Sequence, residues 1–426
     1  MILLPTAMVQ QVPAPQTATP PVAPPAELPA TGIPEDLGFI VLLFVLFVIP
    51  KALQRFRIPA AITSLVLGAM AANFGWVEES LALRLMSTFG IVALFLFAGL
   101  EIDGAELRKG ARTLVEHVIL WSLLLAGVAW ASVTLFGVPV RPSLLVALAL
   151  VTPSTGFILS SLASFGLRPD EQFAVKSKAV GSELIALAVL FFVLQTESVE
   201  RFALAVAALA GIVVVIPYAF RAFAANVAPY APRSEFAFLL MVAVLCAWAT
   251  RRLGVYYLVG AFIVGVAAQR FRERMPAMSS EKMIDALEAF GSVFIPFYFF
   301  GAGMHIHGEQ LSLGALGLGV AMLVLVVPLR VAITVLHRKL GLRETLADAR
   351  RIGVALVPTL VFTLVLVEIL RTQYRTDETL LGGLVLYTVL NTLLPSLLLR
   401  ATPPAFEEPE ASPVEPLVEE SRIVAT

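Results

Sequence analysis

The sequence has 426 residues, of which 58% are hydrophobic and only 14% are charged, and its mean hydropathy is +0.88. Soluble domains carry about 25% charged residues, so this composition excludes a soluble globular protein and indicates an all-α polytopic membrane protein. The net charge of −1 points to no nucleic-acid partner. The one cysteine, Cys246, excludes a disulfide framework and a thiolate metal site.

Proline and charge set the two ends of the chain apart from its middle. Residues 1–36 are rich in proline and contain neither lysine nor arginine, while residues 401–426 are acidic and also contain proline. We expect a disordered extracytoplasmic arm over 1–36, a transmembrane domain over 37–400 and a disordered tail over 401–426. The first residues lack the basic flank of a signal peptide, so none is predicted.

Apolar segments fill the middle of the chain and are separated by charged residues, proline and glycine. Thirteen are predicted to cross the membrane: 37–50, 59–76, 85–100, 114–136, 143–165, 178–195, 202–220, 235–250, 254–269, 284–304, 311–336, 351–370 and 379–399. Loops after odd-numbered segments carry 21 lysines and arginines, against 7 after even-numbered ones. This asymmetry predicts a protein of the inner (plasma) membrane with its N-terminus outside and its C-terminus in the cytoplasm.

The two halves of the sequence resemble each other. "GLEIDGAEL" (99–107) and "GMHIHGEQL" (303–311) share four residues at identical spacing and lie 204 residues apart. Pro153 and Pro358 lie in the middle of two apolar segments, 205 residues apart. Repeats of about 55–195 and 250–400 are therefore predicted. The matching segments are seven spans apart, so the copies have opposite orientations, and we expect broken helices at both prolines that cross near the midplane, as in many transporters.

Glu183 lies inside the apolar segment that follows the first break. A carboxylate in the interior of a helix bundle is costly unless it is neutral, paired or bound to a cation, so it is a functional candidate by default. We predict that Glu183 binds a proton or a monovalent cation, with polar groups from Ser182 and from Thr152, Ser154 and Thr155 of the break. A plainer interpretation is an ion pair between Glu183 and Lys176 or Lys178.

Other polar residues lie inside or beside the apolar segments. Arg330 is a possible charge partner of Glu183 or of Glu368, or an arginine that reaches the membrane surface. Polar residues of the last two segments either line the crossing or join helices: Thr359, Thr363, Thr388 and Asn391. The remaining candidates are interpreted as ordinary groups at the membrane surface: Glu101, Asp103, Glu106, His305 and His307. The alternative for the two histidines is a sensor of external pH.

Three stretches together resemble the monovalent cation/proton antiporter superfamily, and within it the second, mostly bacterial branch. They are the broken segment "ALVTPSTGFILSSLASFG", the acidic segment "AVGSELIALAVLFF" and the helix end "IPFYFFGAGMHI". The resemblance implies two broken helices that cross beside a residue pair whose second member is an ion-binding acid. Ser182 and Glu183 occupy that pair here. Glutamate replaces the family's aspartate, and serine cannot titrate.

The predicted function is secondary antiport of Na⁺ or K⁺ against H⁺ by alternating access. One acid in the pair, and no lysine in the body of the 284–304 segment, predict electroneutral exchange. The resemblance implies a homodimer; no cofactor and no enzymatic activity are expected. Alternatives are a gated potassium efflux pathway and a proton- or sodium-coupled carrier of organic solutes. Potassium efflux systems of this branch carry cytosolic nucleotide-binding domains, and an intramembrane carboxylate would repel an anionic substrate.

Overall fold

The computed structural model describes residues 35–102, 104, 108, 110–195, 198–231, 234–252, 257–272 and 281–399. The predicted tail lies outside the described residues, as do Asp103, Glu106 and all but the last two residues of the predicted arm. Helix α1 (Glu35–Gln54) begins two residues before the predicted boundary at 37. Its first part, residues 35–43, belongs to a separate unit, and the unit that contains the other helices begins at Phe44.

Every regular element of the described chain is helical. After α1 come α2 (Ala60–Asn73), α3 (Leu81–Leu100), α5 (Ala111–Phe136), α6 (Val140–Val151), α7 (Thr155–Ser161), η1 (Leu162–Phe165), α8 (Pro169–Gln195), α9 (Val199–Asn226), α10 (Glu235–Arg252), α11 (Tyr257–Arg272), α12 (Glu281–Met304), η3 (Gly308–Leu311), α13 (Leu313–Gly341), α14 (Leu346–Ala355), α15 (Leu360–Tyr374) and α16 (Glu378–Leu398). Each predicted segment corresponds to one helix or to one broken pair.

Length and hydropathy alone select fewer spans than the thirteen predicted segments. In the described chain, nine helical spans are long and apolar enough to cross a membrane, or ten if α14 and α15 count as one bent span. Helices α2 and α11 are apolar but shorter, and α10 ends in Arg251 and Arg252. Together these helices account for the difference between ten and thirteen.

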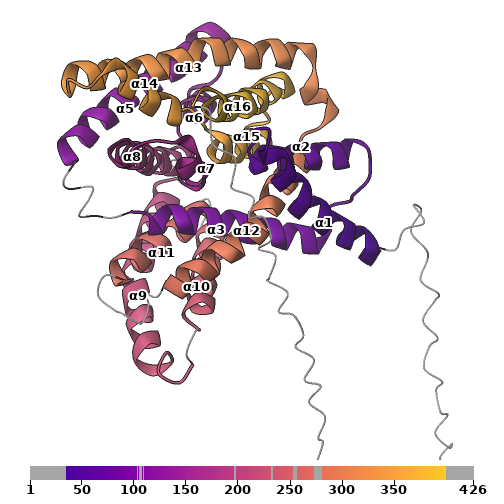
Figure 1. Ribbon diagram of the computed structural model, residues 1–426, viewed down its shortest axis with the longest axis vertical. Coiled ribbons are helices and arrows are strands. Elements are labelled where there is room, and N and C mark those ends of the chain that lie inside the picture. Colours follow the sequence, from indigo (N-terminus) through magenta and orange to yellow (C-terminus); the bar gives the residue numbers. More distant parts are fainter. Residues whose placement is uncertain are drawn as a thin grey trace, which may run out of the picture. The chain divides into compact units, whose positions relative to one another are not determined.

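The helices form two packed groups (Figure 1). Helices α5–α8 pack with α13–α16, and we call this group the crossing bundle. Helices α2, α3 and α9–α12 pack with one another, and we call this group the panel. Direct packing between the groups runs through α3 against α7 and α8 against α9. Each group therefore takes helices from both halves of the sequence.

Glycine contacts in the panel show the reciprocity of the two halves. Helix α2 packs on α12, and α3 packs on α11. Gly99 of α3 lies against Gly265 of α11, while a Cβ on Gly68 of α2 would overlap the Phe300 carbonyl group and a Cβ on Gly303 of α12 would overlap that of Leu65. Small residues let membrane helices approach closely. By their order within the predicted repeats 55–195 and 250–400, α2 corresponds to α11 and α3 to α12, so each half contributes one helix to each close pair.

The two predicted helix breaks are confirmed. Helix α6 ends at Val151 and α7 begins at Thr155, so Pro153 lies in the gap. Helix α14 ends at Ala355 and α15 begins at Leu360, with Pro358 in the gap and a bend of 42° between the two axes. Proline has no N–H to donate and its ring collides with the preceding turn, so each break occurs where a helix cannot continue undisturbed.

Candidate functional site at the helix crossing

The two breaks are in direct contact with each other. The backbone N–H of Ser154 donates to the carbonyl oxygen of Pro358 at 2.8 Å, and the N–H of Val361 donates to Ser154 Oγ at 3.3 Å. All three residues are buried. The ends of four half-helices therefore meet at one point inside the crossing bundle, and backbone groups freed by each break are bonded by the other.

Glu183 lies on α8 at the start of the half-helix α7. Its Oε2 accepts a hydrogen bond from the backbone N–H of Thr155 at 3.1 Å, and its side chain is buried. The first N–H groups of a helix have no partner within the helix, and its dipole favours negative charge there. The side chain of Ser154 makes no cap at this end, so the carboxylate of Glu183 takes that role.

Two hydroxyl groups of the first break have no hydrogen-bond partner in the described part of the chain. They belong to Thr152 and Thr155, both fully buried. Together with the Glu183 carboxylate they provide oxygen atoms, the ligand type that hard cations prefer. No group of three or more His, Cys, Asp or Glu side chains in the described chain is placed to hold a metal ion, so the oxygen set contains a single acid.

Ser182 points to a different neighbour. Its Oγ lies 3.1 Å from Nε2 of His117 on α5, and both side chains are buried. They line a cavity of about 30 Å³ together with Pro153, Arg330 and Thr334, which is enough room for a water molecule. Sequence analysis missed His117. It is a polar residue within the apolar segment 114–136, and the argument that singled out Glu183 applies to it as well.

The plainer interpretation of Glu183 is not what the structure shows. Lys176 pairs with Glu101. Lys178 Nζ lies 3.3 Å from His337 Nδ1 on α13, and the other ring nitrogen of His337 lies 3.0 Å from Glu116 Oε2. Both lysines are thus engaged elsewhere, and neither forms an ion pair with Glu183 among the described contacts.

The expectation for Arg330 was wrong in its partners. Its guanidinium group donates to the carbonyl oxygens of Leu356 at 2.8 Å, Val357 at 2.8 Å and Leu150 at 3.3 Å, and to the Tyr387 hydroxyl at 3.2 Å. Those carbonyls lie at the C-terminal ends of α6 and α14, where acceptors have no partner within the helix and positive charge is favoured. Arg330 therefore binds freed backbone and pairs with neither Glu183 nor Glu368.

The other expected partner, Glu368, is half-buried near the C-terminal end of α15. Its carboxylate lies 3.9 Å from Arg371 on the same helix. Arg371 in turn donates to the carbonyl oxygen of His305 at 2.7 Å, which joins the end of α15 to the end of α12. His305 and His307 are both exposed there, as interfacial histidines are expected to be.

A second polar network lies at the start of α15. The N–H of Thr359 donates to Asn391 Oδ1 at 3.2 Å, and Asn391 Nδ2 donates to Thr359 Oγ1 at 3.0 Å. Thr388 and Thr363 each lie 2.8 Å from the same hydroxyl oxygen. The crossing thus brings together all four polar residues that the sequence assigned either to its lining or to helix contacts.

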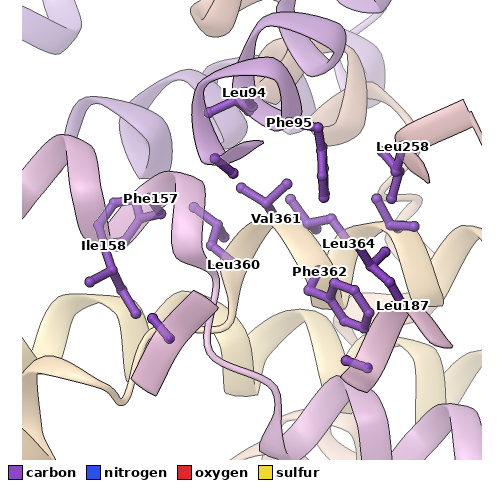
Figure 2. Close-up of a cluster of buried hydrophobic side chains, with 14 of the residues drawn as sticks. Leu94, Phe95, Phe157, Ile158, Leu187, Leu258, Leu360, Val361, Phe362 and Leu364 are labelled. Carbon is purple, nitrogen blue, oxygen red and sulfur yellow. The ribbon is translucent and has the colours of Figure 1, made fainter. Parts of the chain in front are cut away.

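A wide cavity and an apolar cluster flank the crossing. The cavity, of about 1130 Å³, is lined by α7 and α12 and has Lys51 and Arg57 in its wall. The cluster joins the panel to the crossing bundle: Leu94 and Phe95 come from α3 and Leu258 from α11, facing side chains of α7, α8 and α15 (Figure 2). Because α7 and α15 begin at one crossing in inverted repeats, their C-terminal ends point to opposite faces, the first to the cavity and the second to the Arg371–His305 contact.

Comparison with known proteins agrees with this architecture. An antiporter described as probable Na(+)/H(+) antiporter 3 of Methanocaldococcus jannaschii is 25% identical over 284 residues, which cover 62% of this chain and 70% of that protein. An Na(+)/H(+) antiporter of Enterococcus hirae is 22% identical over 294 residues, covering 65% and 75%. The Na(+)/H(+) antiporter NhaS5 of Synechocystis is 24% identical over 283 residues, covering 63% of this chain and 39% of that protein.

Solved structures share the fold. The sodium proton antiporter MjNhaP1 of Methanocaldococcus jannaschii at pH 8 superposes with a TM-score of 0.61 at 14% identity, over 85% of this chain and 95% of that one. A family model described as the transmembrane sodium/hydrogen exchanger matches residues 40–402, nearly the whole membrane part. This multi-pass membrane protein therefore belongs to the sodium/hydrogen exchanger family.

Proposed function

We propose that the protein exchanges Na⁺ for H⁺ across the membrane, with Glu183 as the group that binds either ion. The observation that carries this proposal is a buried carboxylate, held by the first N–H of α7 at 3.1 Å, at a break that also contains two buried hydroxyl groups with no partner in the described chain. A proton neutralises the carboxylate, whereas a cation requires it ionised. The two ions therefore compete for one place, and competition between them is what antiport needs.

The two helix groups support alternating access as the mechanism of this exchange. In this structure a wide cavity adjoins α7, with Leu94 and Phe157 of the apolar cluster in its wall (Figure 2), whereas the end of α15 is joined to the end of α12 by the Arg371–His305 contact. A shift of the crossing bundle relative to the panel would exchange the open side for the closed one. Inverted repeats support this mechanism, because the outward-open and inward-open states are then built from equivalent contacts between helices.

Several finer features belong to the same proposal. The exchange is electroneutral, one cation for one proton, because Glu183 is the one acid of the Ser182–Glu183 pair. The protein lies in the inner (plasma) membrane, and the wide cavity faces the cytoplasm, since Lys51 and Arg57 stand in its wall. A homodimer is what the family resemblance implies. K⁺ is the second candidate cation, and an ion panel decides between the two.

The test uses purified protein in liposomes with an internal pH dye and external Na⁺, K⁺ or Li⁺. With the cation added outside, wild type should make the lumen more alkaline, because the cation enters as protons leave. Glu183→Gln should abolish exchange, and Glu183→Asp should keep part of it because the carboxylate survives with shorter reach. Glu101→Gln, which removes an exposed carboxylate, is the matched control and should exchange normally. Substantial exchange by folded Glu183→Gln would refute the site.

A further inference from the structure

The two broken helices begin their second halves in comparable ways. In the first, Thr155 N–H donates to Glu183 Oε2 at 3.1 Å; in the second, Thr359 N–H donates to Asn391 Oδ1 at 3.2 Å. Asn391 follows Glu183 by 208 residues, three more than the 205 that separate the two prolines, which is about one helical turn. Each half-helix thus starts against a side-chain oxygen from the helix that follows it in the sequence.

Hydrogen bonding differs sharply between the two starts. In the first break the buried hydroxyls of Thr152 and Thr155 have no partner in the described chain. In the second, the hydroxyl of Thr359 is bonded to Asn391, Thr388 and Thr363 at 2.8–3.0 Å. The first break therefore has free oxygen atoms for a cation, and the second has already used its own.

Charge differs in the same way. The carboxyl of Glu183 can lose and regain a proton, whereas the amide of Asn391 cannot. Arg330 from α13 is the buried cation at the crossing, and its donors are taken up by carbonyl and hydroxyl oxygens. His117 from α5 is bonded to Ser182 instead of the start of α15. One half-helix start has a titratable partner, and the other has a neutral one.

We propose that Asn391 is a positioning residue that sets the exchange ratio. Its neutral oxygen binds the N–H at the start of α15 and leaves no place for an ion at the second break. Glu183 is then the one carboxyl that carries an ion, and it carries one ion per cycle. This inference rests on exchange at Glu183. When Na⁺ leaves Glu183 and one H⁺ binds, the charge of the site is unchanged. An acid at position 391 adds a second group, so one Na⁺ exchanges for two H⁺ and one net charge crosses per cycle.

The test is Asn391→Asp in liposomes, with the membrane potential clamped by K⁺ and valinomycin and Na⁺ as substrate. Wild type should exchange at equal rates at both polarities. The exchange rate of Asn391→Asp should depend on the polarity of the potential. The Na⁺ gradient at which its net exchange stops should change by up to about 50-fold at about 100 mV. Asn391→Ser keeps position 391 neutral, and Thr379→Asp adds an acid at the start of α16, outside the wall of the wide cavity; exchange by both variants should remain independent of polarity.

The outcomes distinguish failure of the proposed exchange function from failure of the role proposed for Asn391. Absence of exchange in wild type refutes the proposed function itself. Polarity-independent exchange by Asn391→Asp, with wild type active, overturns the role of Asn391. If the variant folds without turnover, the protons released on Na⁺ addition in detergent are counted, and a count equal to that of wild type overturns the proposal. If it does not fold, Thr388→Asp, whose native hydroxyl also contacts Thr359, takes its place under the same expectation.

Discussion

A buried hydroxyl group without a hydrogen-bond partner destabilises a folded protein by about 1–3 kcal/mol, and the first break contains two of them, on Thr152 and Thr155. Such a cost is reasonable where the groups meet a ligand in another state of the cycle. Thr363, in contrast, donates to the Ala149 carbonyl oxygen at 2.7 Å. The same residue type therefore has opposite energetic roles on the two sides of the crossing.

We predict that Thr155→Val raises stability in Na⁺-free buffer while weakening Na⁺ binding. Valine keeps the shape but removes an unpaired hydroxyl, which should raise the melting temperature, and it removes a cation ligand, which should raise the KM for Na⁺ about 5- to 50-fold. Thermal unfolding with and without Na⁺, and transport at graded Na⁺, measure both effects. Thr363→Val is the control and should lower the melting temperature. A Thr155→Val protein that is less stable and has an unchanged KM would contradict a ligand role.

Single residues were predictable where they break the pattern of their own segment. Glu183 was identified because a carboxylate is out of place in an apolar stretch, and its neighbours at the break followed from the nearby proline. The partners of Arg330 were not predictable, because they are backbone carbonyls that become available only where two helices unwind. The His117–Ser182 contact joins residues 65 positions apart, which no local pattern reveals.

At the scale of elements, the four half-helices depend on side chains from neighbouring helices to satisfy their ends. Arg330 serves the C-terminal ends of α6 and α14, and Glu183 and Asn391 serve the N-terminal ends of α7 and α15. Irregular backbone inside a membrane is tolerated only when its polar groups are satisfied by the protein or by water. The stability of the two breaks therefore depends on the hydrogen bonds of these few side chains.

We expect Arg330→Ala to destabilise the protein by about 3–5 kcal/mol, because it leaves several buried carbonyl oxygens without a donor. Arg330→Lys should fall between this variant and wild type, since one ammonium group cannot reach all the acceptors that a guanidinium group reaches. The melting temperature in detergent is the measurement. Arg112→Ala, which removes an exposed arginine on α5, is the control, and an Arg330→Ala protein as stable as this control would contradict the capping role.

Element types were largely predictable, since apolar length and proline position fix where helices run and where they break. The ends were less so. Helices α2 and α11 are shorter than a full span, and they are held by close glycine contacts with α12 and α3. Those contacts depend on which helices become neighbours in space, and the repeat alone indicates only that the two pairs should be equivalent.

At the scale of the molecule, the crossing bundle contains the candidate site and the panel packs against that bundle. Ion pairs tie the bundle together at one end: Arg351 reaches Glu171 at 3.0 Å, and Arg168 reaches Asp348 at 2.9 Å. The hydrogen bond to Asp348 raises the pKa of Arg168 above its ordinary value. Both pairs join the loop after the first break, or the start of α8, to α14. The two breaks are therefore linked both at the crossing and at the surface, and we expect them to move as one body.

Electroneutral exchange is tested on the whole protein. With one exchangeable ion on Glu183, both loaded states carry the same charge, so a membrane potential has no leverage, whereas each net charge moved would be worth about 2.3 kcal/mol per 100 mV. Rates in liposomes should be equal at opposite polarities, and no current should scale with turnover on a solid-supported membrane. The same result is expected for His117→Gln. Polarity dependence in wild type that disappears in His117→Gln would show that the histidine carries a second proton.

The one-sided cavity has a practical consequence for mapping the protein in its membrane. Cys246 is the one cysteine of the chain, so Cys246→Ser gives a background without thiols. A cysteine in place of Ser161, in the cavity wall, should then react with a membrane-impermeant maleimide added from the cytoplasmic side and not from outside. Reaction from outside alone would reverse the assigned orientation. The cavity thus lets a single chemical label report both the direction in which the chain is inserted and the side from which an ion first enters.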